Sequence, residues 1–297
     1  MNFLTLENVT KSYGEKVLFQ GISLHIDKGQ KIGLIAKNGT GKTTLMRVIA
    51  GRESSEGESA RVTLRKDIRI GWLDQDPDFH PDQDVLGAVL DDSIPLVRLV
   101  RRYEHALAHP ENTAELQEAI TAMDEQQAWS FESKVKELLF RFGMHNLEQP
   151  VRSLSGGQVK RLALVKVLLD EPDFLILDEP TNHLDVDMIE WLEAFLSRSN
   201  LTLLMVTHDR YFLDRVCNHI LEMSQGRLFY HEGNYEYFLQ KKTEREEIRQ
   251  VETGKARQLI KKELEWLRRQ PKARTHKSKS RIGAFDGIKE KAAGAPR

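Results

Sequence analysis

Residues 31–50 place a short apolar run directly before a glycine-containing loop, and this stretch constrains the fold more than any other. The run KIGLIA (31–36) is typical of a buried strand, and the loop that follows reads AKNGTGKT (36–43). A helix is predicted next, from Lys42 to Ala50. Strand, glycine loop and helix in this order predict a phosphate-binding loop, in which backbone N–H groups and a helix N-terminus hold an anion.

The loop departs from the usual pattern G-x-x-x-x-G-K-[ST] at its first position, where Ala36 replaces glycine. Gly39 and Gly41 remain where the backbone must approach a phosphate, so we expect the departure to be tolerated. If the position required a positive φ, alanine would cost about 1–2 kcal/mol. In such a loop Lys42 reaches the β- and γ-phosphates, and Thr43 places its hydroxyl on Mg²⁺. The alternative is a tight glycine turn that only begins a helix.

Short apolar runs alternate with helical patterns along residues 1–235, which predicts an α/β fold with a mostly parallel sheet. Strands are expected at 3–10, 22–26, 68–76, 173–179 and 201–209, with two more before 235, and helices at 84–143, 154–169, 187–198 and 210–217, with breaks near Pro95 and Pro110. Residues 236–270 are charged and nearly free of glycine, which predicts a long helix that Pro271 ends.

Two carboxylates end the apolar run FLILDE, which is too short for a helix and typical of a buried parallel strand. At the carboxyl edge of such a sheet Asp178 lies beside the phosphate loop, where it can hold Mg²⁺ through water. Glu179 can orient or polarise an attacking water. Because adjacent strand residues point to opposite faces, we expect the two to have different roles. The alternative is an acidic strand end at the surface.

Four further residues are each weak evidence on their own. Ser155 in LSGGQ is a predicted cap, and the helix N-terminus after it suits a γ-phosphate. Gln75 follows a strand, where its amide oxygen can bind Mg²⁺ or water. His208 also follows a strand, although a histidine there is more often structural than catalytic. Tyr13 can stack on an adenine ring or pack in the core.

Taken in order, these motifs resemble those of the ATP-binding cassette superfamily, over about residues 1–235. AKNGTGKTT resembles Walker A, Gln75 the Q-loop, LSGGQ (154–158) the signature motif, LILDE Walker B, NHLD (182–185) the D-loop and His208 the switch histidine. The resemblance implies a P-loop NTPase fold with a mostly parallel sheet, an antiparallel β part and a helical subdomain. It also implies ATP as ligand, Mg²⁺ as cofactor and ATP hydrolysis as activity.

The resemblance also implies a role for each matching residue. The ATP-binding residues are then Tyr13, Ala36, Lys37, Asn38, Gly39, Thr40, Gly41, Lys42, Thr43 and Thr44. The metal ligands are Thr43, Gln75 and Asp178, and the catalytic residues are Glu179 and His208. The D-loop contributes Asp185, and the signature residues Ser155, Gly156, Gly157 and Gln158 complete the ATP site of a facing cassette.

Within the superfamily, PTNHLD (180–185) and THDRYFLD (207–214) resemble the ABC-F family of twin-cassette proteins. The domains implied are a cassette at 1–235 and a charged helical interdomain linker at 236–297, where WLRRQPKARTHKSKSR (266–281) is similar to the Uup-type subgroup. A helical subdomain is then expected at about 84–170, with a short arm at about 93–130. The chain holds one cassette where the family has two, so we expect an N-terminal fragment of a longer protein.

The net charge of −1 hides an asymmetry between two parts of the chain. Residues 1–240 hold 26 Lys and Arg against 37 Asp and Glu, whereas residues 241–297 hold 18 against 8. A basic segment of this kind is typical of contact with a polyanion, although a solvated charged helix is an equal alternative. RNA contact is predicted for Arg268, Arg269, Lys272 and Arg274.

The resemblance predicts a ribosome-associated ATPase of the ABC-F type, with rRNA or tRNA as partners of the linker. Because the signature motif serves a facing cassette, a second cassette is needed, either from the other half of the protein or from another copy. The isolated chain is then expected to be a weak ATPase. The alternatives are the ATPase subunit of a membrane transporter, a DNA-acting factor, or a structural protein with a dead site.

Several properties of the chain limit its location. No apolar run reaches the roughly 18 residues that span a bilayer, and the N-terminus has no secretory signal. A single cysteine, Cys217, excludes an internal disulfide. We therefore expect a cytoplasmic protein without a transmembrane segment.

Overall fold

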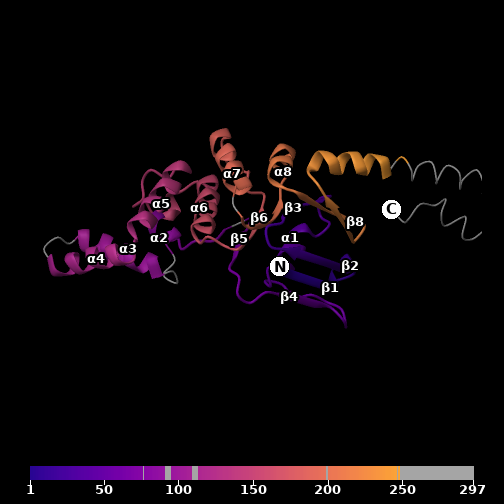
Figure 1. Ribbon diagram of the computed structural model, residues 1–297, viewed down its shortest axis with the longest axis horizontal. Helices are drawn as coiled ribbons and strands as arrows, with labels where there is room; N and C mark the ends of the chain where they lie inside the picture. Colours follow the sequence, from indigo (N-terminus) through magenta and orange to yellow (C-terminus); the bar gives the residue numbers. More distant parts are fainter. Residues whose placement is uncertain (76, 91–94, 109–112, 199, 246, 248–297) are drawn as a thin grey trace, which may run out of the picture. The chain divides into compact units, whose positions relative to one another are not determined.

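The computed structural model describes residues 1–75, 77–90, 95–108, 113–198, 200–245 and 247. The chain divides into two compact units, Met1–Asn234 and Tyr235–Arg297. The first unit holds two β-sheets, helices that pack on them, and a group of helices set apart from the strands (Figure 1). No helix in the described part of the chain has both the length and the apolar character needed to cross a bilayer.

A six-stranded sheet forms the centre of the first unit, with strand order β5-β6-β7-β3-β8-β9. Its strands are β3 (Lys31–Ala36), β5 (Ile70–Leu73), β6 (Phe174–Asp178), β7 (Thr202–Val206), β8 (His219–Ser224) and β9 (Arg227–Glu232). Neighbouring strands are parallel except β9, which pairs antiparallel with β8. Every residue of β6 and β7 is buried, as a parallel strand covered on both faces requires. The predicted mostly parallel sheet is therefore confirmed.

A smaller antiparallel sheet has the order β2-β1-β4 and consists of β1 (Asn2–Tyr13), β2 (Lys16–Asp27) and β4 (Arg61–Leu64). The predicted strands at 3–10 and 22–26 are the centres of a longer hairpin. This hairpin turns at Gly14, whose φ is +59°. Strand β4 was missing from the sequence prediction, because its four residues RVTL are half-exposed or exposed and lack an apolar run. It is stabilised by pairing with β1, a contact between distant parts of the chain.

Helix α1 (Lys42–Ile49) lies between the two sheets (Figure 1). Its apolar side chains, such as Leu45 and Ile49, share one core with residues of β1, β2, β3, β6 and β7. Helices α6 (Gly156–Leu169), α7 (Val186–Arg198) and α8 (Arg210–Val216) cover the other face of the large sheet. Gly33 of β3 allows this close packing, since a Cβ there would lie 2.7 Å from Leu213 of α8. The start of α1 is thus held at the edge of a rigid sheet.

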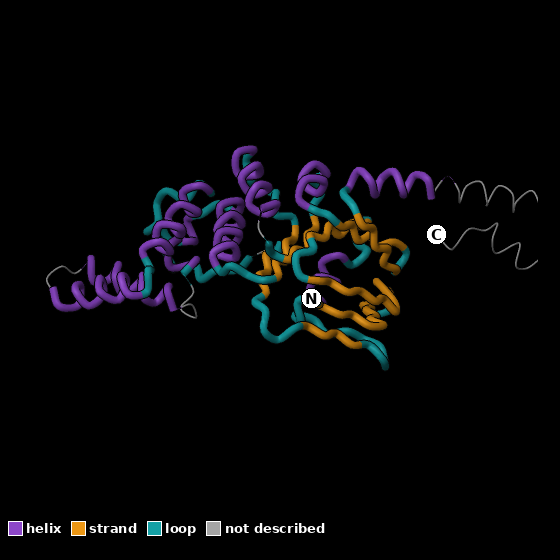
Figure 2. Tube along the Cα trace, in the orientation of Figure 1, coloured by secondary structure: helices purple, strands orange, loops and turns teal. Residues whose placement is uncertain are grey.

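The predicted helical stretch 84–143 consists of α2 (Val85–Val89), α3 (Pro95–Ala108), α4 (Thr113–Glu125) and α5 (Trp129–Arg141). The break predicted near Pro95 is confirmed, because α3 begins there, at a position that proline favours. The break near Pro110 lies outside the described residues. Figure 2 shows these helices gathered apart from the strands, and α3 packs on α4 around a small core of its own that includes Val100 and Met123.

The second unit is described only over its first residues, 235–245 and 247. Residues 235–245 form a helix, in which Lys241 and Glu244 pair one turn apart at 2.8 Å. This agrees with the start of the helix predicted at 236–270. The rest of that helix, Pro271 and the four basic residues predicted to contact RNA lie outside the described residues.

Candidate nucleotide-binding site

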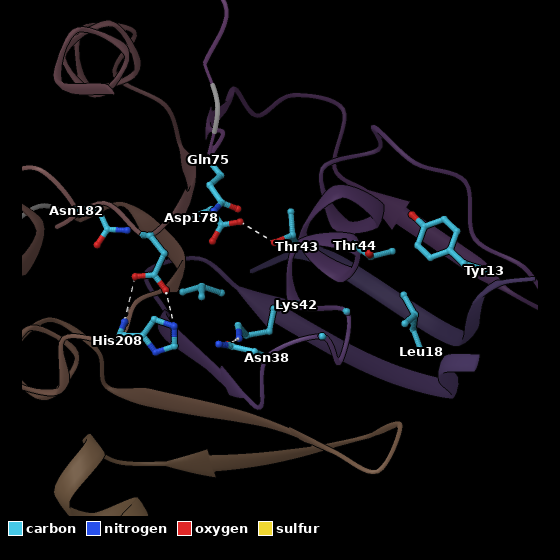
Figure 3. Close-up of a pocket in the computed structure, with 14 residues that line it drawn as sticks. Tyr13, Leu18, Asn38, Lys42, Thr43, Thr44, Gln75, Asp178, Asn182 and His208 are labelled. Atoms are coloured by element: carbon cyan, nitrogen blue, oxygen red, sulfur yellow. Dashed lines mark hydrogen bonds and ion pairs between the residues drawn. The ribbon is translucent and has the colours of Figure 1, made fainter. Parts of the chain in front are cut away.

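The carboxyl ends of β3, β6 and β7 meet at one edge of the large sheet, because these strands are parallel neighbours. A cavity of about 530 Å³ opens at this edge (Figure 3). It is lined by Tyr13, Leu18, Asn38, Gly39, Gly41, Lys42, Thr43, Thr44, Gln75, Asp178, Glu179, Asn182, Val206 and His208. Most of the residues predicted to bind or cleave ATP thus line one cavity, although they come from five separate parts of the sequence.

The loop between β3 and α1 turns on two glycines in the left-handed region. Gly39 has a φ of +73° and Gly41 a φ of +98°. A Cβ on Gly41 would also lie 3.0 Å from the Leu18 side chain. Any other residue at this position would therefore have a strained backbone and would crowd Leu18. By contrast, Ala36 ends strand β3 and is not among the described residues with a positive φ. Alanine in place of the first glycine therefore carries no left-handed strain.

Lys42, the first residue of α1, lies over its own loop. Its ammonium donates to the Ala36 carbonyl and to Oδ1 of Asn38, both at 3.2 Å. These two acceptors hold the ammonium inside the cavity, on the same side as the free N–H groups at the start of α1. One fixed positive charge and a helix N-terminus that face the same space form a site for an anion such as a phosphate.

Thr43 and Asp178 meet across the cavity, 135 positions apart in the sequence. The Thr43 hydroxyl donates to Oδ2 of Asp178 at 2.9 Å. Asp178 is only 5% exposed, and this burial raises the pKa of its carboxyl, although the bond from Thr43 lowers it. The amide side chain of Gln75 lines the same cavity. These three side chains offer a hydroxyl, a carboxylate and an amide oxygen, of which only the carboxylate is charged. This set fits Mg²⁺, because that ion binds few protein ligands and completes its coordination shell with phosphate and water.

Glu179 and His208 form a second pair in the cavity. The His208 backbone N–H donates to Oε2 of Glu179 at 3.1 Å, and Nε2 of the imidazole lies 3.4 Å from Oε1. The Glu179 side chain is 12% exposed, and burial raises the pKa of its carboxyl. Its backbone is left-handed, with a φ of +52°, which is an uncommon and costly conformation for glutamate. Asp178 and Glu179 therefore have different partners.

The two ends of the cavity differ in character. Figure 3 shows Tyr13 and Leu18 at one end, and His208 and Asn182 at the other. The first end is built by the β1–β2 hairpin and offers an aromatic ring and an aliphatic side chain. The second end is polar. A ligand with a flat apolar part and an anionic part fits this division.

Three residues of the predicted loop do not line the cavity: Ala36, Lys37 and Thr40. They shape the loop instead. The Ala36 carbonyl accepts from Lys42, and the Thr40 hydroxyl donates to the Lys37 carbonyl at 2.7 Å. These three residues therefore act through backbone and hydroxyl groups that hold the turn.

The signature residues Ser155, Gly156, Gly157 and Gln158 do not line the cavity either. Ser155 caps α6 as predicted: its hydroxyl accepts from the Gln158 N–H at 3.3 Å, and the Gln158 amide oxygen accepts from the Ser155 N–H at 2.9 Å. The start of α6 lies beside His183, since a Cβ on Gly157 would be 3.4 Å from that residue. Asp185 also lies outside the cavity lining and accepts from the Met188 N–H at the start of α7.

Three lining residues were absent from the predicted site: Leu18, Asn182 and Val206. Asn182 stands in the NHLD motif, three positions after Glu179, and its N–H donates to the Glu179 carbonyl at 3.2 Å. Val206 pairs with Asp178 in the sheet, which only the strand register reveals. Leu18 follows the hairpin turn, and no pattern in the sequence places it against the glycine loop.

Comparison with known proteins agrees with this geometry. The ABC transporter family model matches residues 19–182, and a second ABC transporter model, for an extension of that domain, matches residues 221–296. The ATP-binding subunit of an ABC transporter, a solved structure, superposes with a TM-score of 0.58 at 18% identity, over 77% of this chain and 90% of the other. At that identity the superposition shows the fold alone.

Curated relatives give a closer match. The ABC transporter ATP-binding protein YfmR of Bacillus subtilis is 44% identical over 98% of this chain and 47% of its own length. The energy-dependent translational throttle protein EttA of Mycobacterium tuberculosis is 36% identical over 95% of this chain and 51% of its own, and that of Escherichia coli K12 is 35% identical over 91% and 50%. The chain spans about half the length of these relatives. With this cavity and these matches, the chain belongs to the ATP-binding cassette family, as an ATP-binding domain with its extension and with relatives of the ABC-F type.

Proposed function

We propose that this chain binds ATP with Mg²⁺ and hydrolyses it in the cavity at the edge of the large sheet. The observation that carries the proposal is the pairing of Thr43 with Asp178 and of Glu179 with His208 around the same space as Lys42. A cation, a metal-binding pair and a candidate base are the parts that phosphoryl transfer needs. The family match supports the same activity.

Each part has a definite task in this proposal. The Lys42 ammonium exchanges its two loop acceptors for phosphate oxygens, and the N–H groups of the loop and of α1 bind the remaining anionic oxygens. Thr43, Asp178 and Gln75 hold Mg²⁺, which supplies charge neutralisation for the transferred phosphoryl group. These groups position the triphosphate and exclude competing geometries.

Glu179 orients the attacking water and accepts its proton. The carboxylate is held by two contacts from His208, so its oxygens have a defined direction. Burial raises the pKa of this carboxyl, which makes it a better proton acceptor than an exposed glutamate. His208, with its side chain 71% exposed, is free to contact the γ-phosphate from the open end of the cavity.

A second cassette completes this site in the proposal. The signature residues Ser155 to Gln158 lie outside the cavity that holds Lys42, and Ser155 and Gly156 are exposed, so the start of α6 is accessible to a facing molecule. The facing cassette comes either from a further part of a longer protein or from a second copy of this chain. We therefore expect the isolated chain to be a weak ATPase whose turnover per molecule increases with protein concentration.

We further propose that the protein acts on ribosomes in translation, in the cytoplasm. Several relatives are named translational throttle proteins, and the chain carries a basic segment at 268–281. In this proposal residues 1–235 are the cassette, with a helical subdomain at about 84–170 and an arm at about 93–130. Residues 236–297 are the linker, and Arg268, Arg269, Lys272 and Arg274 bind RNA phosphates, which gives a salt-dependent affinity.

Two measurements test the proposal at separate levels. Binding of a fluorescent ATP analogue to the chain tests the nucleotide site, and absence of Mg²⁺-dependent binding would refute it.

Co-sedimentation of the Glu179→Gln variant with ribosomes in ATP tests the cellular role, with Glu190→Gln of the exposed face of α7 as control. We expect ribosome binding to increase only for Glu179→Gln. Tight ATP binding with background co-sedimentation would reject the ribosome and favour a transporter subunit or a DNA-acting ATPase.

A charge-neutralised variant tests the RNA contact. It replaces four residues together: Arg268, Arg269, Lys272 and Arg274. We expect weaker RNA binding with a flatter salt dependence, because fewer counterions are released. RNA affinity and salt dependence that stay as in the unmodified chain would exclude these residues as the contact.

A further inference from the structure

The end of strand β1 is tied to the loop that follows α1 by a network of side chains. The Lys11 ammonium lies 3.2 Å from Oε1 of Glu53 and 3.4 Å from Oε1 of Glu56, and it donates to the Ser54 carbonyl at 3.0 Å. Oε2 of Glu56 accepts from the N–H and the hydroxyl of Ser12, at 3.1 Å and 2.6 Å. Nothing in the proposed reaction uses these groups.

The network is a specific part of the fold and not a chance surface contact, because its central charge is buried. Lys11 is 7% exposed, and a charge removed from water in this way is stable only with close partners. Burial lowers the pKa of Lys11, but the hydrogen bonds to Glu53 and Glu56 outweigh it and leave the pKa raised. The ammonium therefore stays charged, and the two carboxylates stay fixed around it.

Tyr13 is the outermost member of the network. Its hydroxyl donates to Oε1 of Glu53 at 2.5 Å, the same oxygen that Lys11 contacts. The ring is 53% exposed and lines the cavity (Figure 3), and the Lys11 ammonium lies over it, 5.6 Å from the centroid. An exposed tyrosine without such bonds samples several rotamers. Here one contact fixes the tip of the ring and the other covers one face, which leaves one face for a ligand.

Glu53 is itself anchored to the helix that begins at the phosphate loop. The N–H groups of Arg52 and Glu53 both donate to the Arg47 carbonyl in the last turn of α1, at 2.9 Å and 3.3 Å. Helix α1 starts at Lys42 and Thr43. The Tyr13 ring is thus connected through Glu53 and α1 to Lys42 and Thr43 in the same cavity.

We propose that Glu53 is a positioning residue for the nucleotide base: it fixes the Tyr13 ring, together with Lys11, at a set distance from the phosphate loop. The proposal rests on the proposed ATP-binding function. Its ligand class is a nucleoside triphosphate, whose flat base stacks on the open face of Tyr13 while its phosphates reach Lys42. Glu53 does not touch the ligand. It acts by removing the entropy cost of ordering the ring when the base binds.

The experiment compares the affinity of the chain for Mg²⁺-ATP and for inorganic tripolyphosphate, which has no base. We expect Glu53→Ala to weaken ATP binding by about two- to tenfold, the range for ordering one side chain, with tripolyphosphate affinity unchanged. Tyr13→Phe keeps the ring but loses the hydroxyl, so it should show the same loss. The double variant should lose no more than either single variant.

Two variants serve as controls. Glu53→Gln keeps an oxygen that accepts the Tyr13 hydroxyl, so its ATP affinity should lie close to that of the unmodified chain. Glu58→Ala removes a charge from an exposed position of the same loop and should change neither affinity. If Glu53→Ala fails to fold, the Tyr13→Phe measurement decides alone: unchanged ATP affinity would overturn the proposal.

Other outcomes separate this proposal from the one on which it rests. An equal loss for ATP and tripolyphosphate, or additive losses in the double variant, would show a general structural role and reject the positioning of Tyr13. If the unmodified chain binds neither ligand, the proposed nucleotide function fails first. If the unmodified chain binds both ligands equally well, the phosphate site is supported and the proposed role of the Tyr13 ring is rejected.

Discussion

The nucleotide edge of the large sheet and the α3–α4 hairpin are built on opposite principles. At the edge, residues as distant as Thr43 and Asp178 meet, a carboxylate is buried, and Glu179 holds a left-handed backbone. The hairpin is local: α3 and α4 share a small core, and Arg102 pairs with Glu118 at 2.6 Å. Glu179 and Asp178 therefore combine backbone strain with desolvation at this edge, whereas α3 and α4 have no described non-glycine residue with a positive φ. We therefore expect substitutions at the edge to change chemistry and substitutions in the hairpin to change local stability.

The largest effect is expected for Glu179→Gln. Loss of the proton acceptor should lower ATP turnover by about 10²- to 10⁴-fold, while the similar shape of glutamine keeps ATP affinity near that of the unmodified chain. Steady-state phosphate release and nucleotide binding measure the two effects. Glu190→Gln, on the exposed face of α7, is the matched control. Turnover that falls less than about tenfold would remove Glu179 from the chemistry.

The next effect is expected for Lys42→Ala, which removes the cation of the phosphate loop. Two charge-assisted bonds to phosphate are lost, so ATP affinity should fall by at least about a hundredfold, below detection in a fluorescence titration. Lys28→Ala, an exposed lysine in the turn after β2, should leave the affinity as it is. A measurable affinity in Lys42→Ala would show that the backbone groups alone hold the triphosphate.

Trp129→Ala tests the other side of the comparison. The Trp129 ring packs edge-on against Tyr103 at 4.9 Å, and its N–H donates to Asp124 at 2.7 Å. Its loss should destabilise the hairpin by about 2 kcal/mol, seen as faster amide hydrogen exchange in α3 and α4. ATP affinity should stay within about twofold, because the site lies in another core. Gln126→Ala is the surface control. A large loss of ATP affinity would mean that the two regions are coupled.

A smaller effect is expected for Asp178→Asn on stability. Burial raises the pKa of Asp178, so the folded chain binds this proton more tightly than the unfolded chain. The free energy of unfolding therefore falls as the pH rises from the unfolded pKa of about 3.9 through the raised folded pKa. The variant avoids this cost and should melt at a higher temperature at pH 7, with the difference lost below about pH 4. A lower melting temperature at pH 7 would show that the charge stabilises the fold.

Ala36→Gly should have the smallest effect. Ala36 ends β3 without a positive φ, so glycine relieves no strain and only loosens the strand end. ATP affinity should change less than tenfold. A larger gain in the same titration would mean that the loop is strained by the alanine after all.

Much of the site could be predicted because its residues stand in ordered motifs. Lys42, Thr43 and Asp178 are recognisable from the glycine loop and from an apolar strand that ends in carboxylates. Strand β4 could not be predicted in the same way, since its residues gain stability only by pairing with β1. Leu18 was missed for a similar reason, because its place against Gly41 follows from the hairpin register.

By itself the sequence determined the α/β class, the glycine loop and the strand-end carboxylates, because these depend on local periodicity and on residue types at short spacing. The family was indicated by a resemblance of motifs in a fixed order along residues 1–235. Only the tertiary structure decided that Glu179 turns to His208 while Asp178 turns to Thr43, and that Glu53 holds Tyr13. Such contacts join residues 29 to 135 positions apart. They are set by which strands neighbour each other and by how α1 is packed between two sheets, and no local pattern carries that information.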